Sequence, residues 1–335
     1  HVKLKKFDPE PDSDDELAAN QAGIQGAELQ GGSAVIYNGI EIQCLDKRSV
    51  LPFVSPQQEK TLEYDLARAI SEVVREKKPI VGLMTDLEIA GGQMNPMMMQ
   101  QGRGPTPAWH FFEAIQKDFE VRTLPLSTDA IDSEISTLIV AHPQNITEAA
   151  EYAIDQYIMG GGKVIALLDP DYTIPQRSGN PMMMGGGDNS STFNKLLGAW
   201  GITMTNQVVA DRKYMWTGGR RREPKMIFLT EEGMNSDDVT TNNLKTILLG
   251  HAGAFSGSPA PGLTKTPLLQ SSDQSQMVAA GFSPDNPDAV LTGFAPDGKR
   301  HDIAIRLQGK FKTAFPDGKP KPETEDEDEG EDEDE

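Results

Sequence analysis

Cysteine is almost absent from this sequence, since Cys44 is the only one in 335 residues. A single thiol excludes an intramolecular disulfide and every metal site built from several cysteines. Long apolar runs are also missing, because the longest, such as residues 164–168, are far shorter than the roughly 20 residues that span a bilayer. The sequence begins at His1 without a signal sequence, so we expect an excerpt of a longer chain whose membrane anchor lies elsewhere.

Basic residues are scarce. Lys and Arg total 31 against 51 Asp and Glu, which gives a net charge of −20. Much of this excess is local, because residues 323–335 carry 11 acidic side chains and no basic one. Nucleic-acid binding needs a basic face, and an anionic membrane surface attracts a polybasic patch, so the composition argues against both partners. The acidic segment is too highly charged to bury anything and is expected to be disordered.

Nucleotide-binding and nucleophile motifs are missing as well. No Gly-x-x-x-x-Gly-Lys-[Ser/Thr] sequence occurs. Residues 160–163, Gly-Gly-Gly-Lys, precede a predicted strand, whereas a phosphate-binding loop follows a strand and opens a helix; we interpret them as a helix end. No Gly-x-Ser-x-Gly elbow occurs, and Cys44 lies in a predicted hairpin. We therefore expect no enzymatic activity, in particular no hydrolysis of ATP or glutamine, and neither a cofactor nor a bound metal.

The middle of the sequence alternates short apolar runs with amphipathic helices. Strands are predicted at 80–84, 119–124, 137–141 and 163–168. Helices are predicted near 58–77 (stripe Leu62, Leu66, Ile70, Val73 and Val74), after Thr106-Pro107 (burying Phe111 and Phe112), at 150–158 and from Ser191 to Trp200. Short apolar strands separated by helices indicate a parallel sheet covered on both faces. Right-handed crossovers then give a doubly wound α/β fold.

The two ends of the sequence differ from this middle part. Residues 1–32 are predicted to be a flexible stem. Asn38-Gly39 lies between two β-rich runs and predicts a hairpin, because both residues tolerate positive φ. From about residue 217 onward, strand-like runs alternate with Gly, Pro and Ser loops. We therefore expect an α/β domain with the hairpin over 33–216, a smaller β-rich part over 217–315 and a disordered acidic tail over 316–335.

Four side chains follow strands of the predicted sheet, namely Asp86, His142, Asp169 and Asp171. In open α/β sheets, ligands bind beyond the carboxyl ends of the strands. A carboxylate and an imidazole at that edge can perform acid–base chemistry or bind a cation. The alternative is a structural role, since Asp commonly caps a following loop or helix and His142-Pro143 can shape a turn.

The pentapeptide Asn-Pro-Met-Met-Met occurs twice, at residues 95–99 and 180–184. Each copy follows a predicted parallel strand, so both loops are expected on one face of the α/β body, with most of the methionines exposed or disordered. Flexible thioether side chains suit an adaptable contact surface, formed here by Met97, Met98, Met99, Met182, Met183 and Met184. Low-complexity insertions without function and soft-metal binding are the alternatives.

Several segments follow the order expected of a known family. They are residues 61–70 (TLEYDLARAI) leading into 77–82 (KKPIVG), 154–164 (IDQYIMGGGKV), 167–170 (LLDP), 200–202 (WGI) and 303–311 (IAIRLQGKF). Over about residues 33–315 the chain resembles the GldG family, the auxiliary component of an ABC-type transport system known from bacterial gliding motility. This resemblance implies a membrane-anchored protein whose large periplasmic domain has a class I glutamine-amidotransferase-like fold. It also implies an ABC permease and a separate ATPase as partners, and it supplies no catalytic residues.

Three functions compete on this evidence. The leading one is a non-enzymatic extracytoplasmic module that contacts a transporter, a cargo or other envelope proteins. An amidotransferase-like hydrolase would need a nucleophile after a central strand, but residues 142–144 are His-Pro-Gln. A small-ligand binder, for example for a saccharide, would use the same carboxyl-edge cleft, where aromatic residues for stacking are few.

Overall fold

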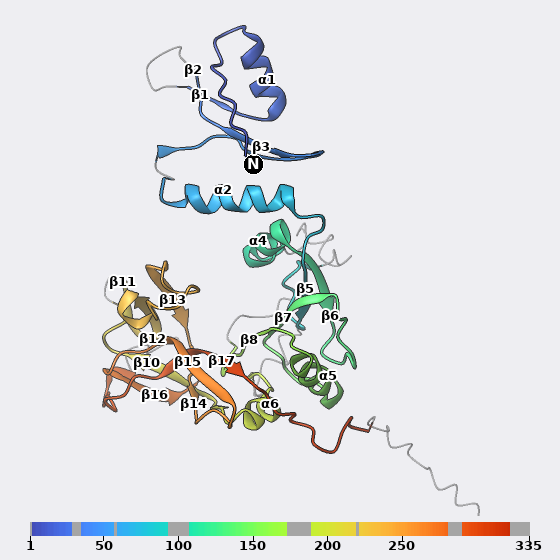
Figure 1. The fold of residues 1–335 in the computed structure, drawn as a ribbon. Helices are drawn as coiled ribbons and strands as arrows, with labels where there is room; N and C mark the ends of the chain where they lie inside the picture. Colours follow the sequence, from blue (N-terminus) through green and yellow to red (C-terminus); the bar gives the residue numbers. More distant parts are fainter. Residues whose placement is uncertain are drawn as a thin grey trace, which may run out of the picture. The chain divides into compact units, whose positions relative to one another are not determined.

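The computed structural model describes residues 2–28, 35–56, 59–92, 107–172, 189–218, 221–280 and 290–321 (Figure 1). Two compact units divide the chain. Residues 1–79 and 117–120 form the first unit, and residues 80–116 and 121–335 form the second. The expected divisions at residues 32 and 216 fall inside these units, so the helix predicted near 58–77 belongs to the N-terminal unit.

The first unit begins with a short helix, α1 (Asp14–Ala22), where the sequence predicted a flexible stem. The Ser13 hydroxyl accepts a hydrogen bond from the backbone N–H of Glu16 and caps this helix. Residues 14–16 are acidic and lie in the first turn, where the helix dipole favours negative charge. The acidic composition that suggested disorder therefore stabilises a helix start, and the stem prediction is wrong for residues 14–22.

Two small antiparallel sheets follow. β1 (Gly26–Glu28) pairs with β2 (Val35–Tyr37), and β3 (Ile40–Cys44) pairs with β4 (Lys47–Leu51). The predicted hairpin is therefore wrong, because Asn38-Gly39 connects two different sheets and the hairpin turn lies between β3 and β4. Gly39 serves a different purpose, since a Cβ there would lie 2.9 Å from the carbonyl oxygen of Leu51.

Helix α2 (Glu59–Val74) confirms the helix predicted near 58–77 and packs against β3 and β4. Its apolar stripe agrees with the prediction at Val73, which is buried, and at Leu62 and Leu66, which are partly buried, but differs at the other two positions. Ala69 and Val73 are buried, whereas Ile70 is 47% exposed and Val74 is 63% exposed. Successive helical residues are turned by about 100°, so a stripe through 69 and 73 directs the residues that follow each of them away from the sheet.

The second unit contains the predicted parallel sheet. Its strands are β5 (Ile80–Met84), β6 (Glu120–Leu124), β7 (Ile135–Ala141) and β8 (Val164–Leu167), in the order β6-β5-β7-β8. β5, β7 and β8 pair in parallel. Helix α4 (His110–Asp118) lies between β5 and β6 in the sequence, and α5 (Glu148–Met159) lies between β7 and β8. The α/β class and the mainly parallel sheet are thus confirmed.

Local signals set both ends of α5, and the glycine run ends it as predicted. The Thr147 side chain accepts a hydrogen bond from the N–H of Ala150 and caps the start of the helix. At the other end, Gly161 adopts a φ of 90°, which glycine reaches without steric cost. The glycine run is therefore a helix end that leads into β8, and it is not a phosphate-binding loop.

The parallel sheet is less completely covered than predicted. β8 is an edge strand, and Ile165 and Leu167 are about half exposed on one of its faces. The other face of β8 carries Val164 and Ala166, which pack into the core beneath α5. On α4, Phe112 is buried but Phe111 is exposed, contrary to the prediction. α4 connects β5 to β6 and α5 connects β7 to β8, but residues 125–134 between β6 and β7 form no helix, so the helical cover of the sheet is incomplete.

The rest of the second unit is antiparallel, which confirms a β-rich C-terminal part that begins before residue 217. Its elements are β9 (Thr203–Met204), β10 (Gln207–Asp211), β11 (Met215–Gly218), β12 (Arg221–Thr230), the 3-10 turn η3 (Glu231–Gly233), β13 (Thr246–Gly250), β14 (Phe255–Ser256), β15 (Leu263–Gln270), β16 (Ser275–Ala279) and β17 (Asp302–Gly309). They form the sheets β15-β17-β14-β9, β11-β12-β13 and β10-β16.

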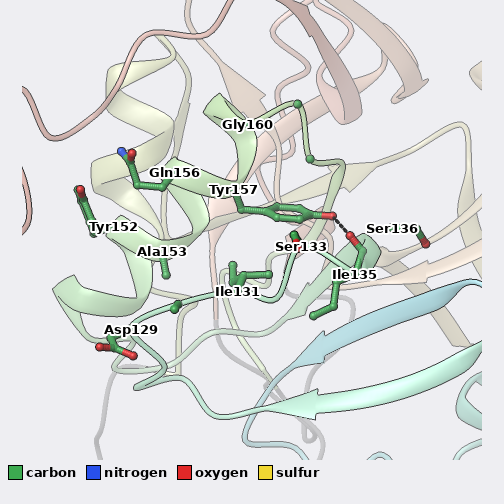
Figure 2. Close-up of a pocket in the computed structure, with 13 residues that line it drawn as sticks. Asp129, Ile131, Ser133, Ile135, Ser136, Tyr152, Ala153, Gln156, Tyr157 and Gly160 are labelled. Atoms are coloured by element: carbon green, nitrogen blue, oxygen red, sulfur yellow. Dashed lines mark hydrogen bonds between the residues drawn. The ribbon is translucent and has the colours of Figure 1, made fainter.

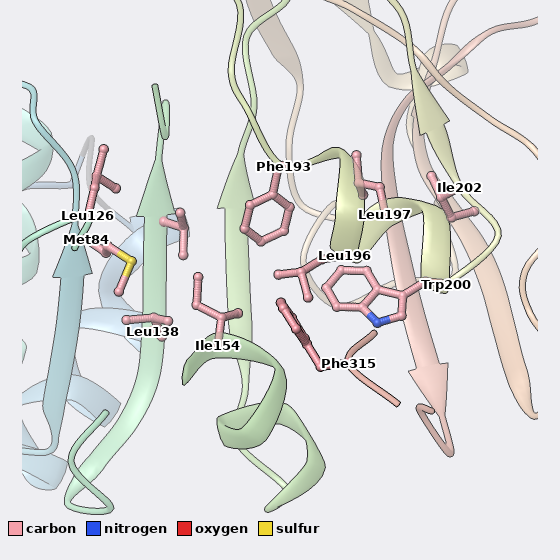
Figure 3. Close-up of a cluster of buried hydrophobic side chains, with 11 residues drawn as sticks. Met84, Leu126, Leu138, Ile154, Phe193, Leu196, Leu197, Trp200, Ile202 and Phe315 are labelled. Atoms are coloured by element: carbon pink, nitrogen blue, oxygen red, sulfur yellow. The ribbon is translucent and has the colours of Figure 1, made fainter. Parts of the chain in front are cut away.

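One hydrophobic core joins the parallel sheet to the antiparallel part (Figure 3). Met84, Leu138 and Val140 contribute from the parallel sheet, and Ile154 contributes from α5. The helix α6 (Asn194–Ala199) adds residues 196 and 197, flanked by Phe193 and Trp200, whose rings pack edge to face. This helix begins three residues later than predicted, because Ser191 makes other contacts described below.

The segment after β17 closes this core. Phe311 packs edge to face against Trp200, and Phe315 does the same against Tyr152. The buried carboxylate of Asp155 on α5 accepts hydrogen bonds from the Ala314 N–H (2.8 Å) and the Thr313 hydroxyl (2.6 Å). Residues 316–321 of the expected tail have a described conformation, while residues 322–335, and with them the expected disorder, lie outside the described residues.

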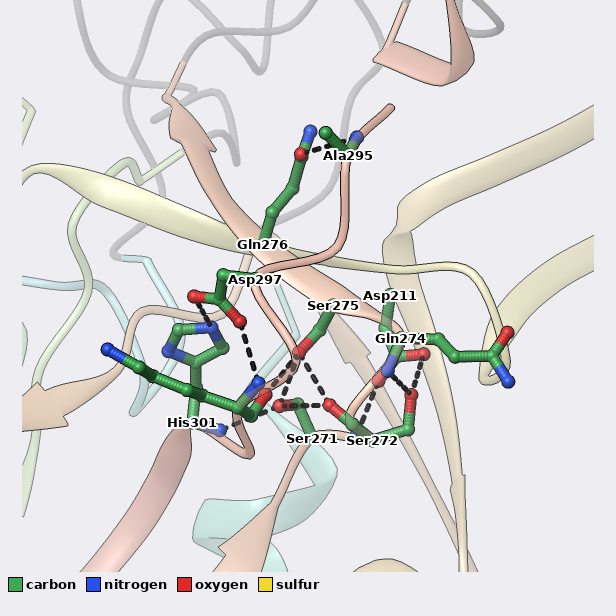
Figure 4. A network of polar contacts seen from close by, with 10 residues as sticks. Asp211, Ser271, Ser272, Gln274, Ser275, Gln276, Ala295, Asp297 and His301 are labelled. Atoms are coloured by element: carbon green, nitrogen blue, oxygen red, sulfur yellow. Dashed lines mark hydrogen bonds and ion pairs between the residues drawn. The ribbon is translucent and has the colours of Figure 1, made fainter. Parts of the chain in front are cut away.

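A buried polar network connects the strands of the antiparallel part (Figure 4). Asp211, at the end of β10, is fully buried. Its carboxylate accepts hydrogen bonds from the backbone N–H groups of residues 213 and 214 and from both the N–H and the hydroxyl of Ser272. Ser271 and Ser275 extend the network to residues 299 and 301. The network fixes the turn between β15 and β16 against the end of β10.

Candidate polar site at the carboxyl edge of the parallel sheet

The structure brings together three of the four predicted site residues. His142 follows β7 and is buried, with a φ of 43° in the left-handed region. Asp169 and Asp171 follow the neighbouring strand β8, and the Asp169 carboxylate accepts the N–H of Asp171 at 3.2 Å. Asp86 follows β5 but is exposed and makes none of these contacts. β5 is also a direct neighbour of β7 in the sheet, so strand order does not set Asp86 apart; its exposed side chain does.

Ser191 links His142 to the segment after β8. Its hydroxyl lies 3.0 Å from Nδ1 of His142 and accepts the N–H of Asp169 at 2.8 Å. The hydroxyl can either donate its own proton to Nδ1 or accept a second hydrogen bond from it, depending on the tautomer of His142. The Tyr172 ring stacks on His142, with ring centroids 4.5 Å apart. We call His142, Asp169, Asp171, Tyr172, Ser191 and the His251 described next the carboxyl-edge cluster.

His251 completes the cluster from the antiparallel part. It follows β13, is buried, and has a φ of 52°. Its Nδ1 lies 3.3 Å from a carboxylate oxygen of Asp171, and both side chains are largely shielded from solvent. The backbone N–H of His251 donates a hydrogen bond to the backbone carbonyl of Lys225 on β12. Sequence reasoning missed His251 and Ser191, because no local pattern connects residues that are 80 and 49 positions from their partners.

Burial dominates the electrostatics of the cluster. It lowers the pKa of His142, and the Asp169 carboxylate opposes this shift only in part. Burial likewise raises the pKa of Asp169, against the N–H of Asp171 and the nearby His142. Burial also raises the pKa of Tyr172, with the Asp169 charge acting in the same direction. Burial thus disfavours the charged forms of His142, Asp169 and Tyr172.

The contacts define what this arrangement can do. A serine hydroxyl bonded to a neutral imidazole is the pairing of a nucleophile with its base. Ser191 and His142 are, however, only 4% and 5% exposed, so a substrate carbonyl cannot reach the hydroxyl without displacement of the surrounding loops. The observed bonds instead tie the ends of β7 and β8 to the start of α6 and to the loop after β13. The arrangement therefore supports a structural joint between the parallel and antiparallel parts.

The Met-rich loops predicted as a contact surface lie in residues 93–106 and 173–188, outside the described residues. This applies to Met97, Met98, Met99, Met182, Met183 and Met184. Their placement on a common face stays a prediction.

A cavity of about 490 Å³ lies at the opposite edge of the sheet (Figure 2). It is lined by the 129–136 loop, by Tyr152 and Gln156 on α5, and by the glycines before β8. The Tyr157 hydroxyl crosses it to donate to the Ile135 carbonyl at 3.0 Å. These residues belong to the amino ends of β7 and β8, so the cavity does not coincide with the predicted cleft.

Glu151 on α5 is a buried carboxyl group with a strongly shifted pKa. Burial raises its pKa to about 7, Lys195 opposes the shift, and Glu148 adds to it. Because the folded pKa lies above the ordinary value of 4.5, the group stabilises the fold fully below pH 4.5. This contribution is lost as the pH rises through about 7. Glu151 thus makes the second unit less stable in alkaline solution.

We expect Glu151→Gln to remove this pH dependence. At pH 8 the variant should be more stable than the wild type by on the order of 1–2 kcal/mol, after allowance for partial screening by solvent. At pH 5 the two proteins should differ little. Thermal unfolding between pH 5 and 8 measures the effect, and Glu88→Gln, at an exposed glutamate of the second unit that does not influence the pKa of Glu151, is the matched control. Parallel stability curves for wild type and Glu151→Gln would contradict the prediction.

The fold and the cluster define a mixed α/β protein in which a small parallel sheet is joined to antiparallel sheets by a buried polar cluster. A family model described as an ABC-type uncharacterized transport system matches residues 78–335. This match covers well over half of the chain and includes the whole of the second unit. The chain therefore belongs to this family of auxiliary components of ABC-type transport systems.

A protein of Borreliella burgdorferi, described as an uncharacterized protein, is 28% identical over 185 residues. The alignment covers 53% of this chain and 32% of that relative. The aligned part of this chain thus spans about a third of the relative's length, and the relative's description adds no activity. In the ranges that the structure describes, no helix combines the length and the apolar character needed to cross a membrane.

Proposed function

We propose that this chain is the periplasmic part of a membrane-anchored auxiliary subunit that acts by contact with an ABC permease, a cargo or another envelope protein, without catalysis of its own. The full-length subunit assembles with the permease and its separate ATPase. The family match over residues 78–335 is the observation that carries this proposal. The resemblance of residues 33–315 to the GldG family supports the finer assignment to the gliding-motility-associated systems and to the extracytoplasmic face of the inner membrane.

The internal chemistry of the second unit supports contact in preference to catalysis. The nucleophile-like pair of Ser191 and His142 is buried and engaged in bonds that hold structural elements together. The glycine run before β8 ends helix α5. No segment of the sequence has the Gly-x-x-x-x-Gly-Lys-[Ser/Thr] pattern of a phosphate-binding loop. ATP hydrolysis would then belong to a separate chain, and this subunit would supply a binding surface.

Affinity capture of the full-length protein from membranes tests the proposal. After mild crosslinking and detergent extraction, we expect an ABC permease and an ATPase to co-purify in comparable amounts. An unrelated membrane protein with the same tag and similar abundance is the control. Accessibility of the second unit to protease added from the periplasmic side checks the location. If neither the permease nor the ATPase co-purifies, the proposed function is wrong. If the second unit is protected from protease added on the periplasmic side, the proposed periplasmic location is wrong.

A further inference from the structure

The sheet β11-β12-β13 ends in an open edge. β13 pairs only with β12 among the residues that the structure describes. Its residues Thr246, Leu248 and Gly250 are exposed, while the alternating residues 247 and 249 are half-buried against the core of this part. The strand sequence, Thr-Ile-Leu-Leu-Gly, contains no charge and no proline. Charged side chains and proline are the features with which proteins usually block an edge strand against pairing with another strand, and β13 has neither.

The alternation of hydrogen-bonded and non-hydrogen-bonded pairs between β12 and β13 shows which backbone groups of β13 face the open edge. The Phe228 N–H donates to the Tyr214 carbonyl, on the β11 side of β12, at 2.7 Å. Phe228 lies opposite Leu248 in the β12–β13 register, so these two residues form a non-hydrogen-bonded pair. The N–H and C=O of Leu248 must then point away from β12. The same alternation directs the backbone groups of Thr246 and Gly250 to the open edge.

The side chains beside this edge are apolar on the outer face. Leu248 is 52% exposed and lies directly across from Phe228, which is 45% exposed. Side chains directly opposite each other on neighbouring strands are in contact, so the two form one apolar patch on this face. The edge therefore offers a partner both an unpaired row of backbone groups and an exposed apolar pair beside it.

We propose that β13 is a self-association surface, at which the occupant is β13 of a second copy of this chain. The strand is self-complementary about Leu248 in an antiparallel arrangement. A two-fold axis at that residue places Leu248 opposite Leu248 of the second copy and Thr246 opposite Gly250 of the second copy. These are the residues whose N–H and C=O groups face the open edge, so each pair can exchange both hydrogen bonds. Residues 247 and 249 meet on the inner face, where both are apolar.

The size of the surface sets the strength of this dimer. A five-residue strand and one apolar pair per copy bury much less than the roughly 1,600 Å² of a standard stable interface. We therefore expect weak association, with a Kd on the order of 10–100 µM. Each copy carries a net charge of −20, so repulsion opposes contact. Added salt screens this repulsion and should strengthen association, because the strand itself is uncharged.

Sedimentation equilibrium of the full chain tests the proposal. Between about 5 and 500 µM the wild type should shift from monomer to dimer, and the shift should occur at lower concentration in 0.5 M than in 0.05 M NaCl. Leu248→Lys should weaken association at least tenfold, because it puts like charges opposite each other across the axis. Val239→Lys, at an apolar residue that is 81% exposed elsewhere, is the matched control and should associate as the wild type does.

A second variant distinguishes backbone hydrogen bonding between strands from non-specific hydrophobic association. Leu248→Pro removes the N–H that faces the open edge and leaves the bonds between β12 and β13 in place. It should abolish the dimer while circular dichroism shows the wild-type fold. A chain that stays monomeric at 500 µM in high salt would overturn the proposal. It would also be overturned if Leu248→Lys lost the permease while self-association was unchanged, because the transporter would then be the occupant of the edge.

Discussion

Replacement of Asp211 with alanine should cost about 3–5 kcal/mol of folding free energy. The fully buried carboxylate accepts hydrogen bonds from three backbone N–H groups, those of Lys213, Tyr214 and Ser272, and from the Ser272 hydroxyl. Alanine would leave these donors without an acceptor in a site closed to water, and each unsatisfied donor costs about 1–3 kcal/mol. The loss is large because one side chain fixes two segments that lie 61 residues apart.

Urea unfolding of the full chain measures this loss as a shift in the transition midpoint at constant slope. Asp273→Ala changes an exposed aspartate in the same turn and should shift stability by less than about 0.5 kcal/mol. Asp211→Asn should give an intermediate loss, because the amide keeps one accepting oxygen and presents donors to donors. If Asp211→Ala unfolds within 1 kcal/mol of the wild type, water or a neighbouring group replaces the carboxylate and the assigned role is wrong.

The parts of the fold that followed from the sequence depend on local signals. The apolar runs at 80–84 and 137–141 become β5 and β7, because only a doubly covered strand favours uninterrupted apolar residues. The Thr147 cap and the glycine run set the ends of α5, because the chemistry of helix ends is decided within a few residues. Such signals need no knowledge of distant partners.

The errors arose where distant partners decide the structure. The Asn38-Gly39 signal is a strong one for a hairpin, yet β2 pairs with β1 and not with β3. The hairpin that forms instead turns at Leu45-Asp46, and its left-handed position, with a φ of 56°, is occupied by Leu45, a residue type that rarely adopts positive φ. β15 was not predicted, and it contains Pro267, which a central strand would reject. It is tolerated because β15 is the edge strand of its sheet and its register shifts next to that proline.

The candidate site shows the same division. His142, Asp169 and Asp171 could be placed at one edge from the parallel strand order alone. His251 reaches Asp171 only because the loop after β13 folds back onto the parallel sheet, and nothing in its own neighbourhood indicates this. The sequence therefore located a polar edge but could not reveal that its groups are buried against one another, and burial decides between a reactive site and a structural joint.

Phe193→Ala should be the most destabilising single truncation in the core, with a loss of about 3–5 kcal/mol. Phe193 is 1% exposed and packs between the parallel sheet and α6, with its ring against Trp200 at a centroid distance of 6.1 Å. Its removal leaves a cavity where the two parts of the second unit meet, so we expect one cooperative transition at lower denaturant for both. Phe111→Ala is the matched control, because that ring is 40% exposed and its loss should cost less than about 1 kcal/mol.

Urea unfolding followed by tryptophan fluorescence and by far-ultraviolet circular dichroism measures both variants. Equal losses in the two variants would contradict the assigned core.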